Sequence, residues 1–415
     1  MKTSPRDAWH HALLGWLNLA LTAPSIYLWL GLPLILRQQG WTGMELGVFQ
    51  LAGLPAIFKF AMAAPLERYR LAGSQYRNWA ILLCLLLTLI LLMLGRQDLL
   101  SSPGALFALA MAAALMATWA DIPVNALAIR LLPEAQRMRA GGVRSAALSA
   151  GSIVGGGLML LLQNQFGWHA PFWSMAGFLA SAAGLLLTIK EPASKADTAT
   201  EQHPQAALMQ FQAYLSQAGA RAWTCLLLLC FPFVGTAWFY LKPLLLDSGF
   251  TIADIAKIAG MGGGAIAAVA SLLAASVCKR IGAIKAIPAC ALLNLVSLST
   301  LSLVVCLNLG SYALLLAALM LAIALGSSAS LAFGLMMYFT RTNRNAIDYS
   351  LQASLFAMSR MAVPLAAGVL LDFFGYRGML LALTLASAGV LVLALKNRQV
   401  VSAVVQQQML AGGAT

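Results

Sequence analysis

Long runs of apolar residues recur along this chain, and the run from Trp79 to Leu94 contains no charged residue. A helix needs about 20 predominantly apolar residues to cross the hydrocarbon core of a bilayer. The run does not alternate between apolar and polar positions, so it does not fit a strand of a membrane barrel. A helix, by contrast, satisfies its backbone hydrogen bonds internally and is stable in lipid. The runs therefore predict an all-α membrane protein.

Composition supports the same conclusion, because 61% of the 415 residues are hydrophobic and only 9% are charged. A soluble domain carries roughly 25% charged residues and could not hide so much apolar surface. At about 20 residues per crossing, the chain can hold about twelve transmembrane helices. We expect spans near residues 12–36, 44–64, 79–95, 104–129, 141–163, 171–189, 222–246, 254–278, 287–307, 312–339, 348–370 and 378–395.

The net charge of +13 has a topological explanation, because the basic residues gather in alternate loops. Basic loops stay on the cytoplasmic side of a membrane. This bias predicts that both termini lie in the cytoplasm, and it explains the basic charge without nucleic acid as a partner. The apolar stretch from Ala12 to Leu36 is too long for a cleavable signal core, so it is expected to remain as the first helix.

Residues typical of enzymes and cofactor sites do not form recognisable motifs. The six cysteines all lie in apolar segments, where buried, inert thiols are expected. The four histidines lie outside the spans and lack the spacing of metal ligands. No nucleotide-binding motif is visible. We expect neither an enzyme nor a bound metal or cofactor.

A polar stretch divides the chain into two similar halves. Residues 190–221 are expected to link a first six-helix bundle (1–189) to a second one (222–415). The pattern Gly40 to Gly47 recurs as Gly249 to Ala256. In each copy a threonine, Thr42 or Thr251, can cap the following helix with an acidic residue three positions later. The spacing favours an internal repeat of two pseudo-symmetric bundles.

Three longer passages resemble one branch of the major facilitator superfamily, the bacterial muropeptide permeases and the single-chain siderophore permeases. They are Leu32 to Lys59, Trp119 to Arg137, and Asp348 to Leu355 followed by Arg360 and Gly368. The compact length is closer to the siderophore permeases of the pyochelin and rhizobactin type. The resemblance implies a monomeric transporter of the bacterial inner membrane that imports a siderophore as a ferric pyochelin-like complex. Proton coupling through Asp121 or Asp348 is a hypothesis that goes with it. A muropeptide transporter, or a drug or metabolite transporter, is the alternative.

The same resemblance gives expectations for the loops and interfaces. Ala63 to Arg68 aligns with Ala275 to Arg280, a degraded form of a cytoplasmic loop of the superfamily. Because Glu67 is acidic and the aligned Lys279 is basic, a latch role is better supported in the first half. The glycines of 151–157 and 260–264 let helices approach closely, and in this superfamily they would form a sliding interface between helices 5 and 8.

Ionisable residues inside the spans are candidates for substrate binding or coupling, because burying a charge in lipid is costly. Asp121 lies deep in the fourth predicted helix, with Asn125 one turn later and Trp119 nearby. Proton or substrate binding and a structural pair with a cation are both open for Asp121. Lys59 either reaches the membrane surface or pairs with Asp348 as a cytoplasmic gate when the inner side is closed.

Arg360 is the strongest candidate, because it lies near the middle of the membrane in the eleventh predicted helix. It could bind an anionic substrate or hold a carboxylate such as Asp121. Further candidates for the cavity lining are polar or aromatic residues on helices that line the cavity in this superfamily. They are Asn18, Thr22 and Trp29 on the first helix and Trp238 on the seventh. Gln352, near Arg360, is also a candidate. Aromatic residues near helix ends also fit a role as interface anchors.

Overall fold

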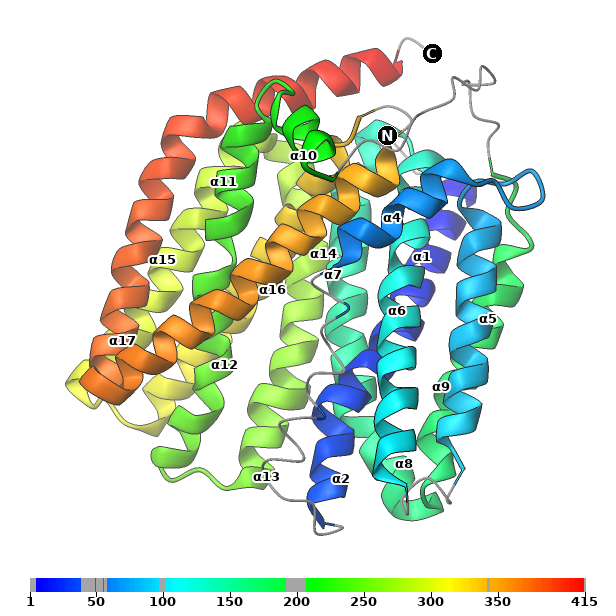
Figure 1. Cartoon of the computed structure of the whole chain (residues 1–415). Helices are drawn as coiled ribbons and strands as arrows, with labels where there is room; N and C mark the ends of the chain where they lie inside the picture. Colours follow the sequence, from blue (N-terminus) through cyan, green and yellow to red (C-terminus); the bar gives the residue numbers. More distant parts are fainter. Residues whose placement is uncertain are drawn as a thin grey trace. The chain divides into compact units, whose positions relative to one another are not determined.

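The computed structural model describes residues 5–38, 49, 55, 58–96, 102–191, 207–341 and 344–413, which form a helical protein (Figure 1). In chain order the elements are α1 (Pro5–Ile26), η1 (Tyr27–Gly31), α2 (Leu32–Gln38), α4 (Lys59–Arg68), α5 (Arg77–Leu94), α6 (Pro103–Leu131), η4 (Glu134–Gln136), α7 (Arg137–Ile153), η5 (Val154–Leu158), α8 (Met159–Phe166), α9 (His169–Leu186), α10 (Ala207–Leu215), α11 (Ala220–Cys230), α12 (Pro232–Asp247), α13 (Ile252–Ile255), η6 (Ala256–Gly262), α14 (Gly263–Ile281), α15 (Ala283–Leu307), α16 (Ser311–Tyr338) and α17 (Asn345–Gly413).

The expected fold class, an all-α membrane protein, is confirmed. Among the described residues, nine stretches are long and apolar enough to cross a membrane. The last stretch, Asn345–Gln408, holds two predicted spans, because Gly375 interrupts α17 with a φ of 63°. α9 occupies the span predicted near 171–189. The span predicted near 44–64 lies mostly outside the described residues.

Helix ends follow local sequence signals. α6 begins with Pro103 in its first turn, where the missing N–H is harmless, and ends before the extended pair Leu132 and Pro133. The predicted cap at Thr251 is confirmed: the Asp254 N–H donates to Thr251 Oγ1 over 3.1 Å, and that hydroxyl donates to Asp254 Oδ2 over 2.6 Å. The corresponding Thr42 lies outside the described residues.

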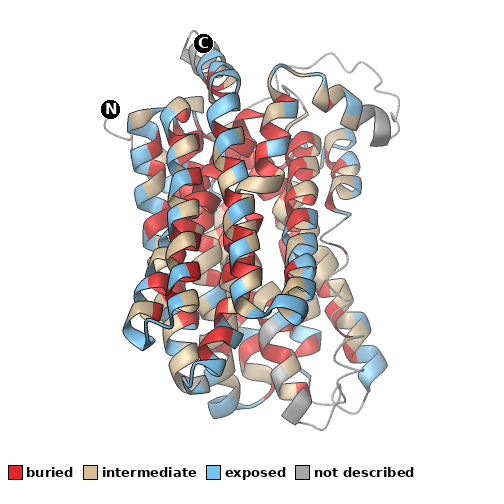
Figure 2. Cartoon of the chain, turned by 90° about the vertical axis from the view of Figure 1, so that its left-hand side faces the viewer, coloured by how far each residue is buried: buried red, intermediate tan, exposed pale blue. Residues whose placement is uncertain are grey.

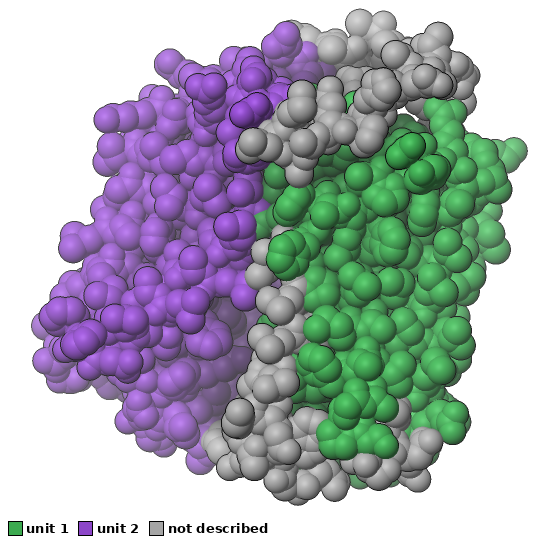
Figure 3. All heavy atoms as spheres, in the orientation of Figure 1, with its two compact units in different colours: residues 1–132, 150–205, 341–354 green, residues 133–149, 206–340, 355–415 purple. Residues whose placement is uncertain are grey.

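Contacts group the chain into two compact units, each described here on its own (Figure 3). Unit 1 comprises residues 1–132, 150–205 and 341–354, and unit 2 comprises residues 133–149, 206–340 and 355–415. Within unit 1, α5 packs against α6 and α9, and α1 packs against the same two helices. Within unit 2, α16 packs against α12, α14 and α15. The predicted division into 1–189, 190–221 and 222–415 stays a prediction.

Large apolar side chains lie both inside the helix packing and on its outer surface (Figure 2). On α15, Leu298 and Leu301 are fully buried in the core of unit 2, whereas Leu303 and Leu307 are more than half exposed. A water-soluble protein rarely exposes a continuous apolar surface of this kind. The exposed faces therefore fit a lipid environment.

The fifth and eighth predicted helices approach each other closely, as expected, but the glycines predicted to mediate this contact have other neighbours. A Cβ on Gly155 would lie 2.3 Å from the Ala23 carbonyl oxygen, so the predicted glycine cluster packs against α1. The approach of α7 to α14 lies further towards the start of α7. A Cβ on Gly142 would lie 2.4 Å from the Ala275 Cβ, and the Ser145 and Ser271 hydroxyls are 2.8 Å apart. Small residues near the start of α7 therefore form this interface.

Candidate substrate and coupling site

The buried ion pair of Lys59 and Asp121 connects two helices of unit 1. Lys59, the first residue of α4, donates from Nζ to Asp121 Oδ2 in α6. The side chains are only 11% and 16% exposed, respectively. Asn125, one turn along α6, donates from Nδ2 to Asp121 Oδ1 over 2.8 Å. The sequence prediction of Asp121 and Asn125 on one helix face is confirmed, and Lys59 joins them.

This cluster has the chemistry of a protonation site. As a carboxylate, Asp121 neutralises the Lys59 ammonium in a region where an isolated charge is costly. Protonation of Asp121 would remove the negative charge that faces the Lys59 ammonium. A proton bound to Asp121 would therefore favour an arrangement in which Lys59 has more water or a different partner. The α4 backbone beside the pair is also held, because Phe60 N–H donates to Ser354 Oγ over 3.2 Å.

The Asp348 carboxylate contacts Arg341 in this structure, not Lys59 as the gate hypothesis requires. Asp348 is fully buried, and its oxygens accept hydrogen bonds from Arg341 Nη2 at 2.6 Å and from the Arg341 backbone N–H at 2.7 Å. Gln352 Nε2 donates to the Asp348 carbonyl oxygen over 3.1 Å. Both side chains thus stabilise the start of α17. A Lys59–Asp348 gate stays a prediction for another conformation.

Arg360 in unit 2 has aromatic neighbours. Its guanidinium carbon lies 5.5 Å from the ring centre of Phe231 and 5.7 Å from that of Phe356. Within the part of the chain that the structure describes, Arg360 makes no hydrogen bond or ion pair. Its five N–H donors match the fork geometry of a carboxylate. The position is therefore suited to an anion that also has an apolar or aromatic part.

The remaining candidates differ in how much of their polar surface is already used. Asn18 donates to the Leu14 carbonyl oxygen at 2.7 Å, and Thr22 donates to the Asn18 carbonyl oxygen at 2.7 Å. These two residues bond within α1. Trp29 is 37% exposed in η1.

The two other tryptophan candidates lie against neighbouring helices. The Trp119 ring lies 6.0 Å from that of Trp79, and within the described chain its buried indole N–H has no acceptor. Trp238 of α12 packs so closely on Gly263 that a Cβ there would lie 2.2 Å from its ring. Trp119 therefore offers a buried polar donor that is unused among the described residues.

Glu67 has partners that the sequence analysis did not identify. Its Oε1 accepts hydrogen bonds from the Ala346 N–H at 2.8 Å and the Tyr76 hydroxyl at 3.0 Å. Glu67 lies three residues beyond the predicted span 44–64, and burial raises the pKa of its carboxyl to about 7, although the hydrogen bonds oppose this shift. The contact joins the loop after α4 to the first turn of α17, which agrees with the expected latch position.

Glu191 is a second buried carboxylate that sequence reasoning missed. Its side chain is 5% exposed and accepts a hydrogen bond from Arg130 Nη1 at 3.0 Å. It also accepts from the backbone N–H groups of Tyr76 at 3.1 Å and Arg77 at 3.0 Å. The Arg130 guanidinium stacks on the Tyr76 ring at 4.5 Å. An acidic residue directly after the span predicted at 171–189 was the available signal.

Comparisons with known proteins agree with this architecture. The sequence model of the Major Facilitator Superfamily matches residues 14–346. The anhydromuropeptide permease of Escherichia coli K12 is 28% identical over 177 residues, 39% of this chain. This match covers 35% of that permease, so the chain spans about a third of the length of the curated relatives it matches.

Two solved transporters have the same fold. The E. coli fucose:proton symporter FucP superposes with a TM-score of 0.72 at 18% identity, covering 93% of this chain and 98% of FucP. The proton:xylose symporter XylE superposes with a TM-score of 0.74 at 13% identity, covering 92% of this chain and 94% of XylE. At such identities the likeness concerns the fold alone, and it confirms the expected major facilitator fold.

Proposed function

This chain belongs to the Major Facilitator Superfamily, a family of membrane transporters and not of enzymes, and from this premise we propose that it imports an anionic solute with a substantial apolar part, driven by the proton gradient. The protein works as a monomer in the bacterial inner membrane, with both termini in the cytoplasm. Alternating access exposes its substrate site first to one side and then to the other.

Arg360 is the observation that carries this proposal. A cation in a predicted membrane span, beside the rings of Phe231 and Phe356 and with no ionic partner among the described residues, is expensive. An anionic substrate would supply the missing partner, and the two rings would contact its apolar part. A charge-assisted hydrogen bond contributes about 1.5–3 kcal/mol, which corresponds to roughly a 10–100-fold difference in affinity.

Asp121 is the proposed proton site. Its carboxylate pairs with Lys59 and accepts a hydrogen bond from Asn125, so its protonation changes the charge balance of three side chains at once. The released Lys59 would then favour a different helix arrangement. This gives proton binding a direct effect on conformation, as coupling requires.

The aligned relative favours a muropeptide as the transported anion. The printed name of the E. coli relative is anhydromuropeptide permease, and a muropeptide carries carboxylates on a sugar and peptide framework. A ferric siderophore of the pyochelin type is the second candidate. The two aromatic rings beside Arg360 support this candidate, because such a complex combines negative charge with aromatic rings.

Uptake into cells that lack their own permeases tests the proposal. Radiolabelled anhydromuropeptide and siderophores loaded with radioactive iron are offered separately, with and without a protonophore. We expect one substrate to accumulate and the protonophore to abolish the accumulation. Arg360→Gln should reduce uptake at least 10-fold, whereas Arg398→Gln, beyond the interruption of α17 at Gly375, should leave it unchanged.

A second arm separates binding from coupling. Asp121→Asn should abolish accumulation but retain exchange of labelled for unlabelled substrate across vesicles, because exchange needs no net proton movement. Accumulation by Asp121→Asn would exclude Asp121 as the proton site. Absence of uptake for every substrate, with the protein verified in the membrane, would contradict the anionic-import proposal itself.

A further inference from the structure

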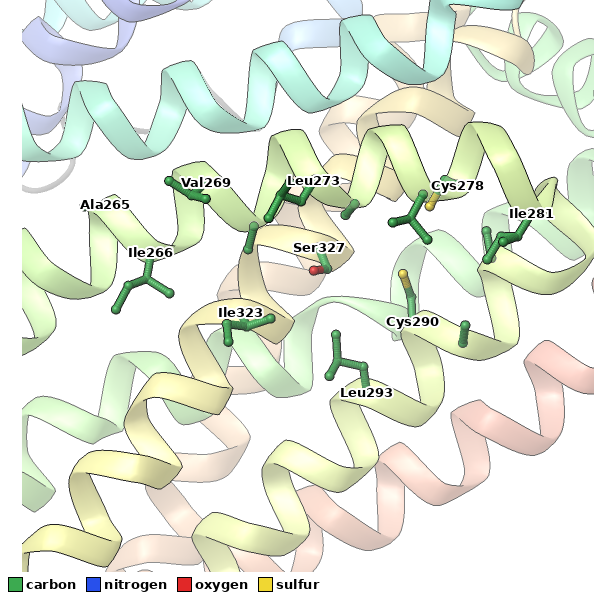
Figure 4. A pocket seen from close by; sticks show the side chains of 15 residues that line it. Ala265, Ile266, Val269, Leu273, Cys278, Ile281, Cys290, Leu293, Ile323 and Ser327 are labelled. Carbon is green, nitrogen blue, oxygen red and sulfur yellow. The ribbon is translucent and has the colours of Figure 1, made fainter.

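An apolar groove runs along α14 in unit 2 and is also lined by residues of α15 and α16 (Figure 4). Its volume is about 590 Å³. Its lining on α14 extends from Ala265 to Ile281, a distance of about 24 Å at 1.5 Å per residue. One leaflet of a bilayer core is only about 15 Å thick, so the groove is long enough to hold an acyl chain through its leaflet.

Among the described residues, little covers the helix face along the groove. Val269, Leu273 and Val277, spaced one turn apart on α14, are 58%, 61% and 51% exposed. These side chains belong to the lining, and together with the small residues beside them they form a continuous apolar surface. In a membrane-spanning helix this surface is covered by lipid chains, and a groove holds a chain more specifically than a flat surface.

The end of the groove is strongly basic. Ile281, its last lining residue on α14, is flanked by Lys279 and Arg280 in the final turn and by Lys285 at the start of α15. All three cations are exposed, and none forms an ion pair within the described residues. The sequence contains no Asp or Glu between Asp254 and Asp348. The basic charge at this turn therefore lacks an acidic partner on its own three helices.

We propose that this groove binds one anionic phospholipid, with an acyl chain along α14 and the phosphate held by Lys279, Arg280 and Lys285. Basic residues where transmembrane helices meet the membrane surface attract anionic headgroups. The acyl chain of a zwitterionic lipid also fits the apolar part, but such a lipid gains less from the three cations and therefore occupies the groove for a smaller fraction of the time. The site thus distinguishes lipids by headgroup charge. It is separate from Arg360 and does not depend on the proposed substrate.

Two cysteines, Cys278 and Cys290, line the groove (Figure 4). Cys290 is half-buried, so a lipid chain in the groove should shield its thiol from a small uncharged reagent, whereas Cys278 is already buried by the protein and should react slowly with or without lipid. Cys225 is exposed elsewhere in unit 2 and serves as an internal reference for reagent access.

The experiment uses the purified full-length protein in nanodiscs of phosphatidylcholine with or without phosphatidylglycerol. N-ethylmaleimide modification of Cys278 and Cys290 is followed by peptide mass spectrometry and normalised to Cys225. We expect phosphatidylglycerol to slow modification at Cys290. The triple variant Lys279→Gln, Arg280→Gln and Lys285→Gln should lose this protection, with roughly 100-fold weaker lipid binding if each charge contributes about fivefold.

A matched variant controls for total charge. Arg221→Gln, Lys396→Gln and Arg398→Gln removes three cations of unit 2 outside the groove lining, and it should behave like the natural protein. A second variant, Ala274→Phe, fills the groove and should lower lipid retention in native mass spectrometry. Equal protection by phosphatidylcholine alone, or equal loss of protection in the control triple variant, would overturn the proposal.

Discussion

The loops after α4 and after α14 come from aligned segments of the two halves, yet their environments are opposite. Glu67, in the last turn of α4, is half-buried and accepts a hydrogen bond from the Ala346 N–H. The aligned Lys279, in the last turn of α14, is exposed and forms no ion pair among the described residues. One loop is fixed by a polar network, and the other is a tight turn at Gly282 with a φ of 76°.

The difference shows how the charge at one aligned position, Glu67 or Lys279, gives the two copies of a repeat different environments. The C-terminal end of a helix favours a cation, so Lys279 suits its own helix. Glu67 is unfavourable for α4 by the same rule, but it faces the N–H groups at the start of α17, where a negative charge is favoured. Glu67 therefore lowers the stability of its own helix end but forms a contact between distant segments. Lys279 stabilises its own helix end, and its charge is exposed to the surroundings.

Breaking the network of the first loop should give the largest effect. Glu191→Ala leaves Arg130 buried without its carboxylate and removes the acceptor of two backbone N–H groups. We expect a loss of about 3–5 kcal/mol in the free energy of unfolding, because an uncompensated buried charge is costly.

Thermal unfolding in detergent, calibrated against denaturant unfolding, measures this loss. Lys279→Ala is the matched control from the second loop and should unfold within about 0.5 kcal/mol of the natural protein. A Glu191→Ala protein as stable as this control would show that the network contributes little.

Protonation of Glu67 should give an intermediate effect with a defined direction. Its pKa is raised to about 7 in the contact with α17, chiefly by burial, from an ordinary value of 4.5. The contact therefore binds a proton more tightly than a released carboxylate does. Its stability rises as the pH falls from about 7 towards 4.5, and it is lost as the pH rises through 7.

Hydrogen exchange of the Ala346 and Ile347 amides can measure this change. After correction for intrinsic exchange, we expect protection to rise up to about tenfold between pH 7.5 and 5.5, a value reduced by the partial exposure of the side chain. Glu67→Gln is permanently neutral and should show no such pH dependence. Equal pH dependence in both proteins would rule out Glu67 as the titrating group.

The sequence predicted features that depend on local pattern better than features that depend on helix packing. Apolar runs located the spans, and the four-residue spacing of Asp121 and Asn125 correctly put them together. The partner of Lys59 was missed, because it depends on whether α4 faces α6 or α17. Similarly, Gly142 contacts α14, whereas the glycine cluster around Gly155 does not. The number of glycines in a segment does not show which helix lies opposite them. The role of Glu191 could not be predicted, because it depends on hydrogen bonds from the backbone N–H groups of Tyr76 and Arg77, which are distant in the sequence.

Reversing the charge in the second loop should give the smallest effect on folding. Lys279→Glu restores the acidic residue found at the aligned Glu67, but it places this charge at the C-terminal end of α14. We expect a loss of about 0.3–1 kcal/mol in the free energy of unfolding from the helix dipole. If Lys279→Glu instead stabilised unit 2 by more than this amount, the second loop would have a hidden cationic partner or an N-terminal contact equivalent to that of Glu67. The repeat would then have preserved both latch positions, and the difference between the loops would lie in the side chain alone.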